Sequence, residues 1–218
     1  MTLAIFDLDN TLLTGDSNQS WGEFLLARNL VEKNVYQTTC QKFHDQYKQG
    51  TLNIHDYLKY SFKPLCNYTL DDLRILHNDF METNIRPMIG NKAKELVAFH
   101  KEKGHILLVI TATVSFVARP IVEAFGIDNL LATELKITNN HYVNEVYGIP
   151  CFKEGKITRL RLLLEKNNYS LAGSTFYTDS HNDIPLLELV DTPVAVDPDE
   201  KLKDLALSKG WNIISLMP

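Results

Sequence analysis

The chain has 218 residues, enough for one sizeable domain or for a core domain that carries a smaller inserted one. Its formal net charge of -5 argues against a nucleic-acid-binding surface, because such surfaces need a clustered excess of Lys and Arg. No stretch approaches the ~20 apolar residues of a membrane helix, so we expect a globular protein that binds neither nucleic acid nor membrane.

Five short apolar runs predict the strands of one sheet. They lack the alternation of apolar and polar residues that a half-exposed strand shows, as expected for strands buried on both faces of a parallel sheet. The runs span residues 3–6, 106–110, 175–177, 193–196 and 212–215. Helical patterns lie between them, and two of these end at Gly104 and Gly126. This alternation predicts right-handed βαβ units and an α/β fold with a doubly wound parallel sheet.

The block that follows the first strand shows a different pattern of apolar and polar residues. It carries four amphipathic helical patterns in succession, and the last opens at a capping box of Thr69 to Asp72. The block is too long for a simple connection and too helical for a disordered loop. We therefore expect an inserted α-helical domain at residues 16–85 and a core domain made of residues 1–15 and 86–218.

Residues 130–147 interrupt the alternation of strand and helix. Their pattern predicts a β-hairpin that turns near Asn139 and Asn140. We expect this hairpin to be an excursion from the main sheet.

Polar residues follow the apolar runs at the carboxyl ends of the predicted strands, where open α/β sheets bind their ligands. In chain order they are Asp7 and Asp9, Thr111 to Thr113, Lys156 at a helix start, and Asp179 to Asp183. They offer four carboxylates, a hydroxyl and an ammonium. That set suits a site for a divalent metal and a phosphate group.

The charges of these groups indicate roles in phosphate chemistry. Asp7 can attack phosphorus and carry a covalent aspartyl phosphate, which divides hydrolysis into two easier steps. Asp9 lies two residues on and faces the same side of an extended backbone as Asp7. It can protonate the leaving alcohol and then take a proton from the attacking water. The Thr111 hydroxyl with nearby backbone N–H groups, together with Lys156, would hold the phosphoryl oxygens.

A carboxylate attacks a phosphate dianion only when charge is neutralised, which predicts bound Mg²⁺. This ion prefers oxygen ligands and keeps several waters. The carboxylates of Asp7 and Asp179 and the backbone carbonyl of Asp9 would hold it, and Asp183 would bind it or orient its waters. Each motif alone has an ordinary explanation as a turn, a helix cap or a surface charge. Four of them at successive strand ends make a strong signal.

With these motifs in view, the chain resembles the phosphatases of the haloacid dehalogenase superfamily, and within them the subfamily IB branch that contains phosphoserine phosphatase. The motifs are Asp7 to Leu13, Thr111, Lys156 and Asp179 to Asp183. The resemblance covers almost the whole chain. It implies a Rossmann-like core, a requirement for Mg²⁺, and a small helical cap after the first strand, which the block at residues 16–85 fits.

The resemblance also implies roles residue by residue. Asp7 would be the nucleophile and Asp9 the general acid and base, with Thr111 and Lys156 completing the catalytic set. The metal site would consist of Asp7, Asp9, Asp179 and Asp183.

The implied substrate is a small phosphorylated metabolite. Its binding positions would be Asp16, Thr111, Ala112, Lys156 and Asn182. Phosphoserine phosphatases place a Glu where Asp16 sits, to meet the substrate amine, and add a cap Arg that has no recognisable equivalent here. The motifs look more like a bacterial subgroup that includes proteins called histidinol-phosphatases. Asp16 facing an amine would suit histidinol phosphate.

Two alternative functions remain at this stage. A phosphotransferase or mutase of the same fold would pass the phosphoryl group to another alcohol. A receiver-like phosphorylated switch shares the sheet, the Asp, the Thr and the Lys, but it would be shorter and would lack the helical insertion.

The cysteines indicate the compartment. Cys40, Cys66 and Cys151 are odd in number and have neither C-x-x-C nor metal-ligand spacing. The N-terminus also lacks the basic and apolar regions of a signal peptide. We therefore expect a cytoplasmic location.

Overall fold

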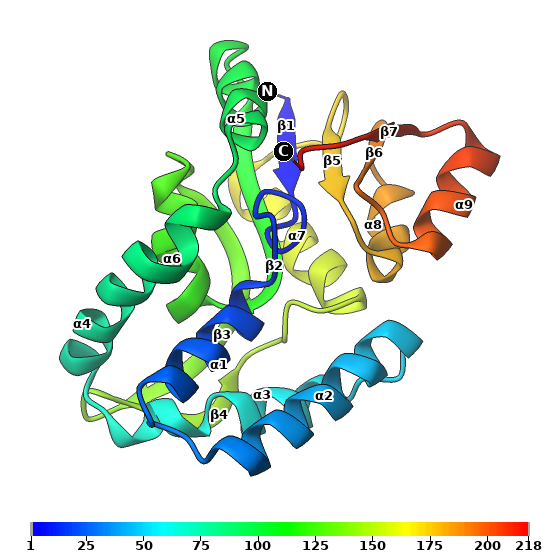
Figure 1. Ribbon diagram of the computed structural model, residues 1–218. Coiled ribbons are helices and arrows are strands. Elements are labelled where there is room, and N and C mark those ends of the chain that lie inside the picture. The colour runs from blue at the N-terminus through cyan, green and yellow to red at the C-terminus, as the bar shows by residue number, and fades with distance from the viewer. Residues whose placement is uncertain (1, 218) are drawn as a thin grey trace.

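A computed structural model of the protein describes residues 2–217, apart from the side chains of residues 34, 35 and 37. In that part of the chain, one sheet holds seven strands in the order β4-β3-β2-β1-β5-β6-β7 (Figure 1). The strands are β1 Leu3–Phe6, β2 Ile106–Val114, β3 Asn129–Thr138, β4 His141–Tyr147, β5 Thr175–Thr178, β6 Thr192–Val196 and β7 Asn212–Ile214. Neighbouring strands run parallel, except that β3 and β4 pair antiparallel. The predicted α/β fold is confirmed.

Helices cover both faces of the sheet, so the fold is doubly wound. They are α5 Asn91–Glu102, α6 Ser115–Ala124, α7 Glu154–Asn167, α8 Ile184–Leu187 and α9 Glu200–Lys209. Ala4 and Phe6 of β1 belong to an apolar cluster that includes residues of α5 and α6. Leu3 and Ile5 belong to a second cluster, with residues of α7, α8 and α9. All four side chains are fully buried, which explains why the run is apolar without alternation.

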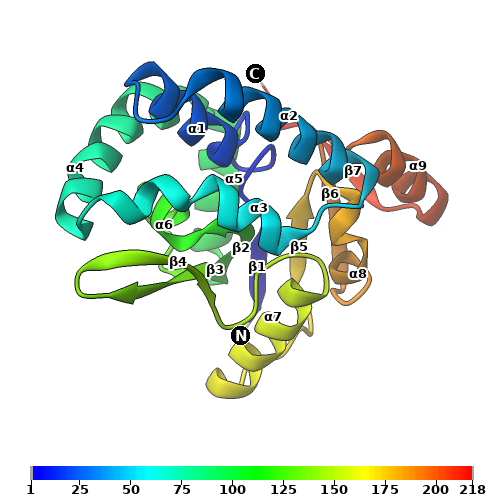
Figure 2. The same ribbon diagram turned by 90° about the horizontal axis from the view of Figure 1, so that it is seen from below.

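A second group of helices lies beyond the carboxyl ends of the strands. It consists of α1 Ser17–Ala27, α2 Lys33–Gln49, α3 Ile54–Ser61 and α4 Leu70–Phe80. Figure 1 shows this helical layer below the tip of β1, and Figure 2, which looks from that side, shows it in front of the sheet. The predicted capping box is present, because Thr69 and Asp72 exchange hydrogen bonds at the start of α4. Among the helices of residues 2–217, none combines the length and apolar character needed to cross a membrane.

The helical layer shares its apolar interior with one face of the sheet. Trp21 of α1 stacks on Phe24 and meets the ring of Phe80 of α4 edge-on. These buried rings belong to the same cluster as Val117 of α6. Helices α1–α4 fall inside the inserted domain expected at residues 16–85. The division from the core stays a prediction, since the apolar cluster runs across it.

Two strand assignments differ from the expectation. The apolar pattern ends the second strand at Ile110, whereas β2 continues to Val114 with an irregular register towards β3. The hairpin of β3 and β4 turns at Asn139 and Asn140, both at positive φ, as predicted. It is not an excursion from the sheet, however, because the first half of β3 pairs in parallel with β2.

Candidate active site

The chain leaves β1 through a tight turn that carries two carboxylates. The Asp7 N–H donates to the Tyr177 carbonyl of β5 at 2.8 Å, so the ladder extends one residue beyond β1. The backbone then turns at Asn10, which has a φ of 54° and donates its N–H to the Gly15 carbonyl at 3.0 Å. Asn tolerates this left-handed conformation better than most residues. The turn therefore leaves Asp7 and Asp9 at the carboxyl edge of the sheet.

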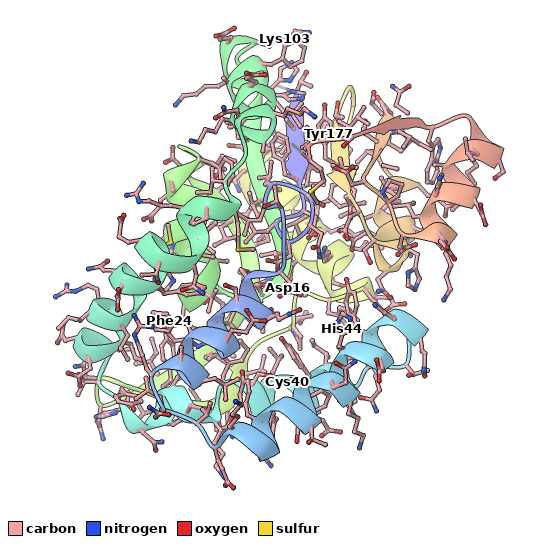
Figure 3. All side chains as sticks on the ribbon, viewed as in Figure 1. Asp16, Phe24, Cys40, His44, Lys103 and Tyr177 are labelled. Carbon is pink, nitrogen blue, oxygen red and sulfur yellow. The ribbon has the colours of Figure 1, made fainter. Side chains whose placement is uncertain are left out.

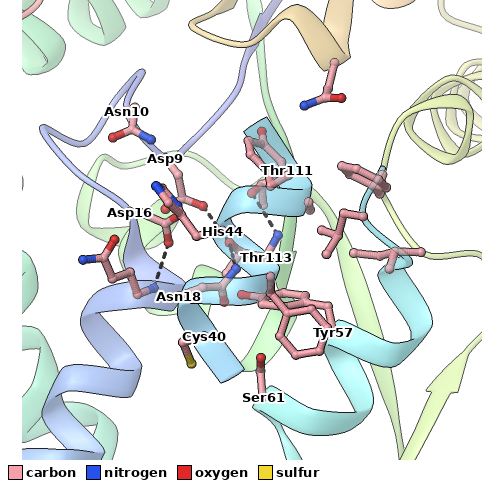
Figure 4. Close-up of a pocket in the computed structure, with 18 of the residues that line it drawn as sticks. Asp9, Asn10, Asp16, Asn18, Cys40, His44, Tyr57, Ser61, Thr111 and Thr113 are labelled. Carbon is pink, nitrogen blue, oxygen red and sulfur yellow. Dashed lines mark hydrogen bonds between the residues drawn. The ribbon is translucent and has the colours of Figure 1, made fainter. Parts of the chain in front are cut away.

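A cavity of about 430 Å³ lies between this edge and helices α1–α3. Every site residue predicted from the sequence lines it, namely Asp7, Asp9, Asp16, Thr111, Ala112, Lys156, Asp179, Asn182 and Asp183. In Figure 3, Asp16 lies between the strand ends and α2, Cys40 and His44 lie on α2 itself, and Lys103 lies at the opposite end of the molecule. Figure 4 gives a close-up of the cavity. The topology thus gathers residues that are far apart in the sequence at the edge where ligands of such sheets bind.

The Lys156 ammonium lies between two buried carboxylates. Its Nζ donates to Asp7 Oδ1 at 2.8 Å and to Asp183 Oδ2 at 2.7 Å. The Thr178 hydroxyl donates to the same Asp183 oxygen at 2.9 Å. Burial alone lowers the pKa of Lys156, but the carboxylates of Asp183 and Asp7 outweigh it and hold this pKa well above its usual range. Lys156 is therefore positively charged at neutral pH.

Buried carboxylates outnumber the positive charge at this edge. Burial raises the pKa of Asp7 to about 7, although Lys156 acts against the rise. Burial and repulsion from Asp7 hold the pKa of Asp179 well above its ordinary value. A bound cation would relieve this excess of negative charge.

The groups at this edge that could ligate a metal ion present oxygen atoms, which Mg²⁺ prefers as ligands. The Thr11 hydroxyl donates to Asp179 Oδ1 at 3.3 Å and accepts the Asp179 N–H at 3.1 Å, so it fixes the direction of that carboxylate. Within residues 2–217, no group of three or more Asp, Glu, His or Cys side chains is arranged so that it could hold a metal ion by itself. Mg²⁺ does not need such a group, since it keeps waters and takes one or two carboxylates with phosphate oxygens. The residues present fit the ion that the sequence implies.

Each oxygen of Asp9 accepts one hydrogen bond from a different element. The Ser17 N–H at the start of α1 donates to Oδ1 at 2.7 Å, and the Thr113 hydroxyl of β2 donates to Oδ2 at 2.6 Å. Burial and the charge of Asp16 raise the pKa of Asp9 to about 6, while hydrogen bonding from Ser17 and Thr113 acts against the rise. An acid with such a pKa can both give and take a proton near neutral pH.

Thr111 reaches the cavity from the last part of β2, and Asn182 from the turn that follows β5. Thr111 Oγ1 accepts the Thr113 N–H at 3.1 Å, so its own hydrogen can be given to a ligand oxygen. The N–H and Nδ2 of Asn182 donate to Ser180 Oγ at 3.2 and 3.3 Å. Ser180 Oγ also lies 3.1 Å from the Tyr47 hydroxyl of α2, which connects the fourth motif to the helical layer.

The opposite wall of the cavity contains residues that the sequence analysis did not identify. They come from α1, α2 and α3 and are Asn18, Gln19, Glu23, Tyr36, Cys40, Phe43, His44, Tyr47, Tyr57 and Ser61. Glu23 follows Asp16 by two helical turns, so helical spacing could have placed both on one face. The aromatic residues carry no such signal. Tertiary packing alone decides which face of α2 or α3 meets the cavity.

Three arginines in or next to the helical layer are engaged at the surface. Arg28 pairs with Asp79, Arg74 with Asp71, and Arg86 with Glu82. Among the described residues that line the cavity, Lys156 is the one Lys or Arg, and both Asp7 and Asp183 hold it. The wall away from the strand ends therefore offers carboxylates, from Asp16 and Glu23, without a matching Lys or Arg.

Known proteins are similar to this chain over nearly its whole length. The pattern of the haloacid dehalogenase-like hydrolases matches residues 4–188. A histidinol-phosphatase of Neisseria meningitidis is 40% identical over 217 residues, which cover 98% of each protein. A phosphoserine phosphatase of Mycobacterium tuberculosis is 30% identical over 216 residues, which cover 96% of this chain and 69% of that protein.

Two solved structures illustrate the likeness in fold. A Bordetella pertussis protein of unknown function is 34% identical and superposes with a TM-score of 0.92 over all of both chains. A phospho-aspartyl intermediate analogue of phosphoserine phosphatase superposes with a TM-score of 0.70, over 99% of this chain and 92% of that one. Its identity is 18%, so this second likeness concerns the fold alone.

Proposed function

This chain belongs to the family of haloacid dehalogenase-like hydrolases, and on that premise we propose that it is a Mg²⁺-dependent phosphatase of small phosphate monoesters. Asp7 is the nucleophile and carries an aspartyl phosphate. One observation carries the proposal: three strand-end motifs and Lys156 at the start of α7 line a single cavity, and Lys156 Nζ lies within hydrogen-bond distance of both Asp7 and Asp183.

Hydrolysis proceeds in two halves at Asp7 and Asp9. First, an Asp7 carboxylate oxygen attacks phosphorus, the bond from phosphorus to the ester oxygen breaks, and Asp9 gives its proton to the departing alcohol. Then Asp9 takes a proton from a water, which attacks the aspartyl phosphate and releases inorganic phosphate. Asp7 must be ionised for the attack, and its contact with Lys156 favours that form.

Other residues of the edge bind the transferring group. The phosphoryl oxygens are held by Lys156, the Thr111 hydroxyl and the Ala112 N–H, with Asn182 nearby. The ligands for Mg²⁺ would be the carboxylates of Asp7 and Asp179 and the backbone carbonyl of Asp9, and Asp183 would bind the ion or orient its waters. The ion, when bound, neutralises charge on the phosphoryl oxygens. Asp183 Oδ2 is already engaged by Lys156 and Thr178, so its contribution comes from the other oxygen or through water.

The cavity wall supports a substrate with a cationic group, and we propose histidinol phosphate, an alkyl phosphate that carries an amine and an imidazole. Asp16 and Glu23 offer carboxylates to a cation. Phosphoserine would bring a carboxylate as well, and in the described lining Lys156 is the one Lys or Arg that could meet it. Aromatic side chains of α2 and α3 suit a flat ring. The 40% identical relative named a histidinol-phosphatase adds support.

Free thiols support a reducing location. Cys40, Cys66 and Cys151 are unpaired, and Cys151 is fully buried. Structural disulfides are rare in the cytoplasm, where thiols stay reduced. We place the reaction there.

Release of inorganic phosphate tests the proposal. Protein stripped with EDTA is assayed on histidinol phosphate, phosphoserine and p-nitrophenyl phosphate before and after Mg²⁺ is added back. We expect activity only with Mg²⁺, and the highest kcat/KM on histidinol phosphate. Metal-independent turnover would contradict the metal site. Recovery of glycerol phosphate in place of free phosphate, when glycerol is added, would point to a phosphotransferase instead.

A further inference from the structure

A short chain of hydrogen bonds joins the helical layer to Asp9. Asn18 Nδ2, in the first turn of α1, donates to Thr113 Oγ1 at 2.8 Å. The Thr113 hydroxyl in turn donates to Asp9 Oδ2 at 2.6 Å. All three residues line the cavity, where Figure 4 labels them. The fold thus links a helix, a strand and the turn after β1 through two side-chain contacts.

The direction of this chain follows from its chemistry. An ionised carboxylate can only accept, so the single hydroxyl hydrogen of Thr113 goes to Asp9. The Thr113 oxygen is then an acceptor, and Asn18 must present its amide N–H to it. Because Asn18 presents an N–H donor to Thr113, the Thr113 hydroxyl hydrogen cannot turn towards that N–H and stays on Asp9. Asn18 therefore fixes the Thr113 hydroxyl, and Thr113 fixes one oxygen of Asp9.

Thr113 is also protected from replacement by solvent. Its side chain is fully buried, at 0% exposure, so water cannot easily substitute for the hydroxyl. The second Asp9 oxygen is held by the Ser17 backbone N–H. Donors from the start of α1 and from β2, one on each carboxylate oxygen, thus determine the rotation of the Asp9 carboxyl group. The Ser17 donor survives any side-chain substitution, whereas the Thr113 donor can be removed by one isosteric change.

We propose that Thr113 and Asn18 are positioning residues that aim the Asp9 carboxyl at the leaving-group oxygen. This inference rests on the proposed phosphatase function, in which Asp9 is the general acid and base. Such positioning matters most for an alkyl ester, because an alkoxide leaves poorly unless it is protonated. It matters least for an aryl ester such as p-nitrophenyl phosphate, whose phenolate leaves without help.

The Thr113→Val variant tests the inference, since valine keeps the shape and loses the hydroxyl. We expect kcat on histidinol phosphate to fall about 10- to 100-fold, a misplacement effect that is smaller than complete loss of the acid. On p-nitrophenyl phosphate kcat should change by less than about threefold, since protonation contributes little there. Thr113→Ser should restore most of the alkyl ester rate. Asn18→Ala should show the same ester preference with a smaller loss.

Further variants separate positioning from general damage. Thr175→Val removes a buried hydroxyl on β5 that does not line the cavity, and it should leave both rates unchanged. In an Asp9→Asn background, Thr113→Val should cost nothing more, because residues that act through one group are not additive. Equal losses on both esters, or a further loss in the Asp9→Asn background, would overturn the inference.

A crystal structure of Thr113→Val separates this inference from the proposed function. We expect the Asp9 carboxyl to be rotated or split between orientations in the variant, with Asp7 and Lys156 unmoved. An unchanged Asp9 would overturn the positioning role, even in an active phosphatase. A wild type that hydrolyses neither ester would refute the phosphatase function, and the orientation of Asp9 would still decide the role of Thr113.

Discussion

Lys156→Met removes the cation from two buried carboxylates and keeps a side chain of similar length. Asp7 is 7% exposed and Asp183 3%, so solvent cannot compensate for the lost ammonium. Breaking a buried ion pair by removing one partner costs about 3–5 kcal/mol. We therefore expect Lys156→Met to lower the free energy of unfolding at pH 8 by about that amount. The raised pKa of Lys156 lies above its ordinary value of 10.5, so its stabilising charge is fully present below that pH.

The cost of this substitution should depend on the charge of its partners. The pKa of Asp7 is about 7, so at pH 5.5 Asp7 is largely protonated and Lys156 has one charged partner fewer. We expect the loss there to be smaller by about 1 kcal/mol or more, since one pKa unit corresponds to about 1.4 kcal/mol.

Urea unfolding in EDTA at pH 8 and pH 5.5 measures both losses. Lys166→Met, at an exposed position near the end of the same helix, is the matched control and should change stability by less than about 0.5 kcal/mol. The reasoning would be refuted by equal losses at the two pH values. It would also be refuted if Lys156→Met were no worse than the control.

Three further predictions follow from the same groups. The folded-state pKa values of Asp7 and Asp9, about 7 and about 6, lie above the ordinary value of 3.8. Between pH 3.8 and these raised values, the folded state therefore binds more protons than the unfolded state. Metal-free protein should therefore lose stability as the pH rises from 4 to 7, and calorimetry should show Mg²⁺ raising the Tm more at pH 8 than at pH 5; a Tm independent of pH would be contrary evidence. Asp9→Asn should lower kcat on histidinol phosphate by ~10²–10⁴-fold in a phosphate-release assay, and a normal rate would remove Asp9 from the mechanism. Asp16→Asn keeps an N-cap residue for α1, and like Glu23→Gln it should raise the KM for histidinol phosphate about tenfold while leaving that for p-nitrophenyl phosphate unchanged. Equal effects on both substrates would argue against a cation-binding wall.

The sheet could be predicted from the sequence because each strand has to satisfy two apolar faces. The run of Leu3 to Phe6 alternates between two clusters, which leaves no polar position inside it. The end of β2 could not be predicted in this way, because polar Thr111 and Thr113 continue the strand although both are fully buried. Their hydroxyls are satisfied inside the site, Thr113 by Asp9 and Thr111 by a backbone N–H. Hydrophobicity alone cannot detect such residues.

The candidate site also has one part that could be predicted from the sequence and one part that could not. The strand-end residues were predictable because topology brings the carboxyl ends of parallel strands to one edge. The wall across the cavity was not, because it depends on how α2 and α3 pack over that edge. Tyr57 illustrates the difficulty, since it packs against the apolar cluster and also lines the cavity. A periodic pattern identifies its helix face as buried but does not distinguish a core from a binding wall.

Acid-quenched turnover followed by peptide mass mapping tests the central claim most directly. Wild-type protein mixed briefly with p-nitrophenyl phosphate and Mg²⁺ should carry one phosphoryl group on the peptide that contains Asp7. The label should be absent from Asp7→Asn protein and from protein kept in EDTA. Phosphate release without any label on Asp7, or a label on another residue, would contradict the account.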